Sequence, residues 1–322
     1  MALSMTNLRT TLSVALCILA GCSGIQHDVP ATSKADEQAA LLEIDAYSPS
    51  VTSNGTSDSE AERRLQDVYV KVRPAATEIC RHAGENRVCS WNISYSDLKE
   101  YNAFATSGNQ VVVFNGIISA TDNNDELAFV LAHELGHHVA DHINETRKRA
   151  NTGILVTGLA MAGLSHGVSG CNTYACLSGL QNAAQASMQL GGNVGVLMFS
   201  VEQEKEADYL AAYILNLAGY DLEKSRAMLL KLGVKMEDKE TGFLNSHPAG
   251  PERLASYDKT IEVIENDSDG FPGLEQFEED NKTKKADSTS ENVVSGTGES
   301  KVDKFDPATC RLYMPAEKIC IY

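Results

Sequence analysis

Two histidines with a glutamate between them are the residues of this chain best suited to chemistry. His133 and His137 stand four positions apart, and Glu134 directly follows the first of them. On a helix, residues four positions apart share one face, so both imidazoles can bind the same zinc ion. Glu134 would then point at the open coordination position, where a carboxylate can act as a general base. The pattern predicts one zinc ion per chain.

A third ligand must come from elsewhere, because a catalytic zinc takes three protein ligands and keeps one position open for water. An acidic segment offers four candidates, Glu202, Glu204, Glu206 and Asp208. Glu204 and Asp208 lie one helical turn apart. If Glu204 binds zinc, Asp208 can accept a hydrogen bond from a ligand histidine and hold its tautomer. Without the histidine pair, the same segment would be interpreted as a solvated helix face.

Together these residues suit the hydrolysis of a peptide bond. Bound zinc would polarise the peptide carbonyl and lower the pKa of a coordinated water toward about 7. Glu134 can take the proton from that water and then deliver it to the leaving amine. The predicted activity is that of a zinc-dependent peptidase.

A helix and a small sheet must position these groups. The helix is predicted to begin near Asn123, whose side chain can cap it, and its apolar stripe continues to Val139. Short β-type runs between residues 91 and 114 predict a small antiparallel sheet. The last run, residues 111–114, is expected to present an exposed edge that pairs with an extended peptide.

The combined motifs resemble those of the HtpX/BepA/LoiP-type zinc metallopeptidases, gluzincins related to the CAAX prenyl proteases. The His133–His137 motif is followed about 70 residues later by Glu204-Lys205-Glu206-Ala207-Asp208. Further similar segments are Asn102–Ala105, Val113–Ile118, Asp125–Ala128, Ala218–Asp221 and Ser246–Pro248 with Arg253. The resemblance covers about residues 60–260. It implies a mostly helical, zincin-like α+β fold, with a small antiparallel sheet beside the zinc helix. It also implies that His133, His137 and Glu204 are zinc ligands and that Glu134 is the base.

Three other histidines need separate interpretations. The resemblance favours an active-site role for His247, which could stabilise the oxyanion of the tetrahedral intermediate or silence the site as a fourth zinc ligand. A surface histidine that caps a helix near Pro251 is the alternative. His138 and His142 are expected to serve packing or to face solvent.

The N-terminus predicts export and lipid attachment. The apolar run from Leu12 to Ala20 is too short to span a bilayer and indicates a signal peptide over residues 1–21. Leu19-Ala20-Gly21-Cys22 resembles a bacterial lipobox, in which the new terminal Cys22 carries acyl chains. Ser23 resembles an outer-membrane sorting signal. An ordinary signal peptide with an incidental cysteine is the alternative reading.

The remaining cysteines predict an oxidising compartment. They form three close pairs: Cys80 with Cys89, Cys171 with Cys176, and Cys310 with Cys320. Such spacing suits local disulfides in the periplasm. A cysteine-based metal site is disfavoured because no C-x-x-C pair is present.

Composition divides the chain into five parts. They are a signal peptide (1–21), a lipidated flexible tether (22–59, with a short helix near Glu37–Ile44), a metallopeptidase domain (60–264), an acidic disordered segment (265–306) and a disulfide-closed loop (307–322). Within the domain, the apolar insert 153–199 could be buried core, a lid, or a surface that touches lipid or unfolded substrate. The net charge of -17 argues against nucleic acid as a partner.

Two functions are compatible with these features. The first is a zinc endopeptidase on the periplasmic side of a Gram-negative outer membrane, which hydrolyses misfolded or damaged envelope proteins. The second is a chaperone-like factor for outer-membrane protein assembly that uses the same cleft without catalysis. Both predict unfolded or extended polypeptides as partners, a membrane contact through the N-terminal lipid, and a link to the outer-membrane assembly machinery. Only the first requires Glu134.

Overall fold

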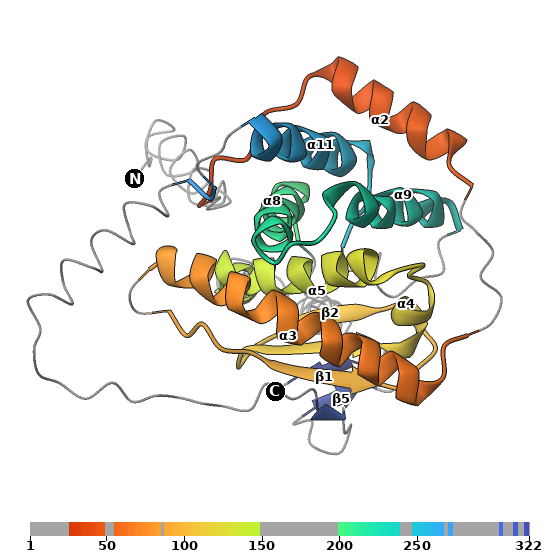
Figure 1. The fold of residues 1–322 in the computed structure, drawn as a ribbon, viewed down its shortest axis with the longest axis vertical. Coiled ribbons are helices and arrows are strands. Elements are labelled where there is room, and N and C mark those ends of the chain that lie inside the picture. Colours follow the sequence, from red (N-terminus) through yellow and green to blue (C-terminus); the bar gives the residue numbers. More distant parts are fainter. Residues whose placement is uncertain are drawn as a thin grey trace, which may run out of the picture.

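The computed structural model describes residues 26–48, 55–84, 87–148, 199–238, 247–266, 270–272, 303–304, 312–314 and 319–321. These residues form a mostly helical α+β fold with a small sheet, as the sequence predicts (Figure 1). Cys22, residues 153–198 of the apolar insert and most of the acidic segment lie outside the described residues. Within the described ranges, no helix is long and apolar enough to cross a membrane.

The central element is α5, Asn124–Val139, which carries the His-Glu-x-x-His motif. The predicted cap is present, because the Asn123 side chain accepts a hydrogen bond from the backbone N–H of Glu126. Figure 1 shows α5 between the sheet on one side and α8, α9 and α11 on the other. Nearly all of α5 is buried. Its polar motif residues therefore meet other protein groups rather than water.

Four further helices surround α5. The long helix α3, Asp58–His82, packs directly against it. α8, Val201–Leu217, starts with a capping box made by Ser200 and Gln203 and ends before Gly219, whose φ of 68° suits a helix C-terminus. α9, Leu222–Asp238, and α11, Pro251–Asn266, complete the layer above α5.

The sheet is mixed, so the prediction of an antiparallel sheet is wrong for the strand that follows Trp91, which pairs in parallel with both of its neighbours. Its order is β2-β3-β1-β4, formed by β1 (Asn92–Ser96), β2 (Ala103–Thr106), β3 (Gln110–Phe114) and β4 (Asp303–Lys304). β2 and β3 form an antiparallel hairpin, whereas β3 and β4 run parallel to β1. The short helix α4, Asn115–Ser119, follows β3. β5 (Leu312–Met314) and β6 (Ile319–Ile321) pair separately.

The strand that we predicted to be an exposed edge is a central strand. β3 lies between β2 and β1, and Val111, Val112 and Val113 are fully buried. An uninterrupted β-branched run is typical of a strand covered on both faces, whereas a strand with one face in solvent alternates apolar and polar residues. Among the described strands, β2 is the edge strand on this side of the sheet.

The N-terminal segment is docked on the domain, so the prediction of a flexible tether over 22–59 is wrong for its described middle part. The short helix predicted near Glu37–Ile44 is present as α2, Lys34–Ala46, with a capping box at Ser33. α2 packs against α11 and α9. Ile44 fills the space beside Gly233, where an added Cβ would lie 2.9 Å from the Ile44 side chain.

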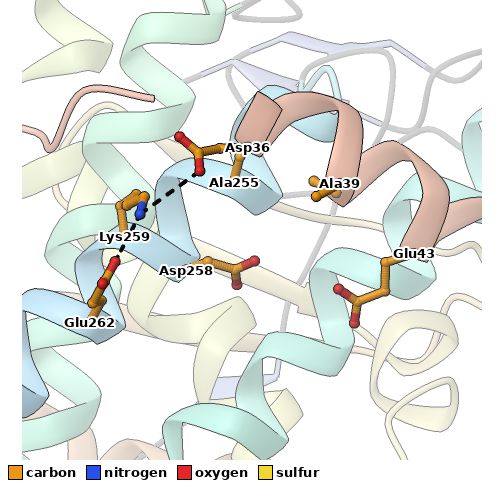
Figure 2. Close-up of a pocket in the computed structure, with 8 residues that line it drawn as sticks. Asp36, Ala39, Glu43, Ala255, Asp258, Lys259 and Glu262 are labelled. Atoms are coloured by element: carbon orange, nitrogen blue, oxygen red, sulfur yellow. Dashed lines mark hydrogen bonds and ion pairs between the residues drawn. The ribbon is translucent and has the colours of Figure 1, made fainter. Parts of the chain in front are cut away.

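Ion pairs line the groove between α2 and α11 (Figure 2). Lys259 of α11 lies 3.8 Å from Asp36 of α2 and 2.9 Å from Glu262. Arg226 of α9 donates to Glu43 of α2 and also to Asp258 of α11. Surface pairs of this kind contribute little stability singly, but these contacts define one position for α2.

One of the three predicted cysteine pairs lies within the described part of the chain. Cys80, near the end of α3, is joined to Cys89, with 5.7 Å between their Cα atoms. This bond would anchor the C-terminal end of α3 to the segment that leads into β1. The pairs Cys171–Cys176 and Cys310–Cys320 involve side chains outside the described residues and stay predictions.

Candidate metal centre

The site forms where α5 and α8 cross at close range. Gly136 lies against Ala207, and a Cβ atom at Gly136 would stand only 2.8 Å from the carbonyl oxygen of Ala207. A side chain at this position would force the two helices apart, so glycine permits the approach. The crossing brings His133 and His137 of α5 against Glu204 of α8.

The three predicted ligand residues converge on one point. His133 Nε2 lies 3.1 Å from His137 Nε2. Each nitrogen also lies near the Glu204 carboxylate, at 3.4 Å from Oε2 for His133 and 3.3 Å from Oε1 for His137. The edge of a tetrahedron built on metal–nitrogen bonds of 2.0–2.1 Å is about 3.3 Å. The spacing of the donor atoms therefore matches tetrahedral metal coordination.

The proton arrangement also fits a cation. His133 Nδ1 lies 2.8 Å from Asp208 Oδ1, and because a carboxylate only accepts, Nδ1 carries a proton; in the neutral ring this leaves a lone pair on Nε2. That lone pair faces His137 Nε2 and the Glu204 carboxylate in a fully buried site. Burial lowers the pKa of His133, but Glu204 and Asp208 outweigh it and raise this pKa to about 9, so without a metal Nε2 holds a proton, which a metal cation would replace. Imidazole nitrogens with one carboxylate are a typical donor set for zinc.

His247 lies at the same centre and is 1% exposed, so it is not a surface histidine. Its Nδ1 atom stands 3.2 Å from His133 Nε2 and 3.1 Å from Glu204 Oε1. Donor atoms of His133, His137, Glu204 and His247 all lie within 4.8 Å of one another. The other ring nitrogen, Nε2, lies 3.5 Å from Glu134 Oε1. His247 therefore faces both the predicted ligands and the predicted base.

Burial and neighbouring charges together set the charge states of Glu134, Glu204 and His137. Burial raises the pKa of Glu134, which increases the affinity of its carboxylate for a proton. Burial acts in the same direction on Glu204, but the Arg253 guanidinium and the neighbouring imidazoles outweigh it and hold the pKa of Glu204 well below its usual range. Burial also lowers the pKa of His137 and keeps this imidazole neutral. A charged Glu204 and a neutral His137 are the forms that bind metal.

Asp208 makes the contact that we predicted, and Arg253 supports it from the other side. Asp208 accepts the Nδ1 proton of His133. Arg253 of α11 donates through Nε and Nη2 to the two oxygens of Asp208, each at 2.8 Å, and lies 2.6 Å from Glu204 Oε2 through Nη1. The sequence assigned no role to Arg253. Its ion pairs show that it holds the carboxylates of Glu204 and Asp208 on α8.

His138 and His142 were both expected to serve packing or to face solvent, and the structure adds polar contacts for His142 that we did not predict. His138 is partly buried and lies 3.1 Å from the Gln110 carbonyl, away from the donor atoms. His142 is fully buried, and its Nδ1 lies 2.9 Å from Nδ1 of His137. Its Nε2 lies 3.0 Å from Glu206 Oε2. α5 ends before Asp141, and residues 142–148 form a separate helical segment. Because this break was not predicted, the five-residue separation of His137 and His142 did not indicate that their rings would meet.

Together, a helix that carries His-Glu-x-x-His and a crossing helix that supplies a glutamate define a zincin-like metallopeptidase fold. Residues 63–261 match the family model described as Peptidase family M48. This match covers more than half of the chain, which therefore belongs to peptidase family M48.

Curated relatives agree with this assignment. A beta-barrel assembly-enhancing protease of Yersinia pestis is 29% identical over 253 residues, which are 70% of this chain and 49% of that relative. The mitochondrial metalloendopeptidase OMA1 of Arabidopsis thaliana is 29% identical over 197 residues, 61% of this chain and 37% of that relative. OMA1 of Schizosaccharomyces pombe is 29% identical over 188 residues, 55% of this chain and 51% of that relative. The chain thus spans about half of these relatives or less.

Proposed function

We propose that this protein is a zinc-dependent endopeptidase of the cell envelope that hydrolyses misfolded or damaged envelope proteins. The observation that carries the proposal is the convergence of His133, His137 and Glu204 at tetrahedral spacing, with the buried Glu134 beside them. Family membership and the metalloendopeptidase names of the relatives support the same activity.

The chain's own residues perform the proton transfers in this proposal. A bound zinc would supply Lewis acidity and lower the pKa of water. The Glu134 carboxylate takes a proton from the attacking water and later gives it to the leaving amine. The raised pKa of Glu134 suits this task, because a base works best when its pKa is near the working pH. Arg253 and Asp208 keep Glu204 and His133 oriented throughout.

The edge of β2 is the proposed binding site for substrate backbone. Among the described strands, β2 pairs on one side only, with β3. α5 contacts β2, and the backbone of Ala105 lies close enough to Glu134 to affect its pKa. An extended peptide that adds to this edge would place a carbonyl near Glu134. Strand addition uses backbone hydrogen bonds, which favours unfolded substrates of varied sequence.

His247 is proposed to regulate or assist the site. Its Nδ1 lies 3.2 Å from His133 Nε2 and 3.1 Å from Glu204 Oε1, which supports the role of a fourth ligand that must leave before substrate binds. Its Nε2 faces Glu134, which would suit stabilisation of an oxyanion. His247→Ala separates the two roles: proteolysis increases if His247 blocks the site and falls if it stabilises the intermediate.

The proposed location is the periplasmic face of the outer membrane, through lipid on Cys22. The lipobox-like sequence and the cysteine pairs support this location. The name of the Yersinia pestis relative also links that protein to β-barrel assembly. Metabolic labelling with a palmitate analogue and membrane fractionation of Cys22→Ala test the anchor. An unlabelled wild-type protein would contradict it.

The activity is tested by cleavage of an unfolded reporter protein, with zinc content measured in the same samples. Glu134→Gln keeps the size of the side chain and removes the base. Glu202→Gln, an exposed glutamate of α8, makes the same chemical change away from the site and is the matched control. Loss of cleavage in Glu134→Gln alone, with zinc retained, supports the endopeptidase. If the Glu134→Gln variant supports outer-membrane protein assembly as well as wild type does, the result would favour the chaperone-like alternative.

A further inference from the structure

A second chain of hydrogen bonds starts at the ligand His137 and runs away from the metal centre. His137 Nδ1 lies 2.9 Å from His142 Nδ1, and His142 Nε2 lies 3.0 Å from Glu206 Oε2. All three side chains are completely buried. The chain connects α5, the helical segment after it and α8.

Only one proton arrangement lets His137 bind a metal through Nε2. The neutral ring then carries its proton on Nδ1 and donates it to Nδ1 of His142. Because that nitrogen is an acceptor, the proton of His142 must lie on Nε2, where it donates to Glu206. The Glu206 carboxylate, which only accepts, ends the sequence of donors. The geometry therefore selects one tautomer for each histidine.

The other oxygen of Glu206 is held by the N-terminal segment. Glu206 Oε1 accepts from the backbone N–H groups of Gln26, at 2.7 Å, and His27, at 2.9 Å. The Nδ1 atom of His27 lies 2.7 Å from the same oxygen. The Gln26 side chain donates to the carbonyl of Ala140 at 2.8 Å, and Arg87 donates to the Gln26 side chain and to the Val139 carbonyl.

We propose that His142 and Glu206 are positioning residues that fix the tautomer and orientation of His137, and that docking of Gln26–His27 on Glu206 completes this support. The inference rests on the metal site of the proposed function. It adds that metal affinity depends on a segment close to the proposed lipid anchor. A carboxylate behind a metal-bound histidine raises the basicity of the ligand and orients it. Here His142 transmits that effect over one additional ring.

Zinc affinity, measured by competition with a chromophoric chelator, tests the proposal on the full chain. His142→Leu removes the acceptor for His137 and is expected to weaken zinc binding by about 10–100-fold. His142→Asn retains an oxygen close to the Nδ1 position and is expected to lose less. Glu206→Gln is expected to fall between wild type and His142→Leu. His27→Ala removes one of the three donors to Glu206 Oε1 and is expected to cost at most about tenfold.

His138→Leu is the matched control, because it removes a neighbouring histidine that touches none of the donor atoms. It is expected to bind zinc as wild type does. The visible spectrum of the cobalt-substituted protein gives a second readout, which should change in His142→Leu and not in His138→Leu. Thermal unfolding of the metal-free proteins shows whether each variant folds, and His142→Asn serves if His142→Leu does not.

Three outcomes are decisive. A loss of affinity in the His142, Glu206 and His27 variants but not in His138→Leu, with partial retention in His142→Asn, supports the inference. Equal zinc affinity and an unchanged cobalt spectrum in a folded His142 variant would overturn it while leaving the metal site intact. If wild type itself binds no zinc, the proposed function fails at its metal site, and the inference fails with it.

Discussion

The two proposed ligand histidines are supported in different ways. His133 donates to Asp208, which is held by the buried guanidinium of Arg253. His137 donates to His142 and through it to Glu206, which receives donors from Gln26 and His27, about 180 residues away in sequence. The first chain ends on a buried opposite charge. The second ends on backbone N–H groups of a docked segment.

The support of His133 needs only the folded domain, whereas the support of His137 also depends on the N-terminal segment. Asp208 and Arg253 belong to α8 and α11, which form the core of the domain. The hydrogen-bond chain from His133 through Asp208 to Arg253, here called the His133 chain, therefore forms whenever the domain folds. The hydrogen-bond chain from His137 through His142 to Glu206, the His137 chain, needs the N-terminal segment in place as well. If the segment leaves, Glu206 Oε1 loses its three donors in a buried environment, where unpaired polar groups are costly. The second chain is therefore the one through which displacement of the N-terminal segment would alter the proposed metal site.

The largest effect is expected from Glu134→Gln, because Glu134 belongs to neither chain and is the proposed general base. General acid–base catalysis contributes about 10²–10⁴-fold, so kcat should fall by that factor. Zinc affinity should stay close to that of wild type. Single-turnover cleavage with parallel zinc titration checks both. A large loss of zinc would show that Glu134 also supports the metal ligands, and the loss of cleavage could then not be assigned to proton transfer alone.

The next largest effect is expected from Arg253→Met, because this substitution removes the last residue of the His133 chain. Removal of the guanidinium leaves Glu204 and Asp208 buried without their cation, which typically costs about 3–5 kcal/mol of unfolding free energy. Urea denaturation of the metal-free protein measures the loss. Arg63→Met, at an exposed ion pair on α3, is the control and should change stability by about 0.5 kcal/mol or less. A stable Arg253→Met protein would argue against support by buried charge.

Asp208→Asn should weaken zinc binding by about 10–100-fold through His133. The amide can still accept one hydrogen bond but carries no charge to oppose Arg253. Chelator competition compares this variant directly with Glu206→Gln, which makes the same change in the other chain. We expect the larger loss in Asp208→Asn, because Asp208 contacts the ligand itself. The opposite order would make the His137 chain the dominant one.

The smallest effect concerns docking of α2 at acidic pH. The hydrogen bond from Arg226 lowers the pKa of Glu43 and outweighs the opposing effect of burial. A carboxyl whose folded pKa is lowered stabilises the fold above its unfolded pKa of about 4.3, and this stabilisation is lost as pH falls through the folded value. The stability difference between wild type and Glu43→Gln should therefore be present at pH 6 and shrink below about pH 4. Hydrogen exchange of α2 amides measures it, and a pH-independent difference would contradict the assignment.

Much of the metal site follows from local sequence. His133 and His137 share a face because of helical periodicity, and Glu204 and Asp208 do so for the same reason. The cap at Asn123 and the helix around Glu37–Ile44 depend on nearby residues and were also predicted. Short-range rules suffice where the partners are separated by one helical turn.

Other features depended on partners far apart in sequence. The place of β3 at the centre of the sheet was decided by its parallel pairing with β1, which no turn between them encodes. The roles of Arg253 and His142 appeared only when three separate helices were brought together. The docking of Gln26 on Glu206 joins the two most distant partners of the site.

The sequence by itself determined which residues can bind a metal and which can move a proton, because these properties depend on residue type and helical spacing. Only the tertiary structure decided how the ligands are held. Buried polar groups need partners, and which partner each one meets depends on the way distant segments pack. For His133 that partner lies in the core of the domain, and for His137 the support extends to the N-terminal segment.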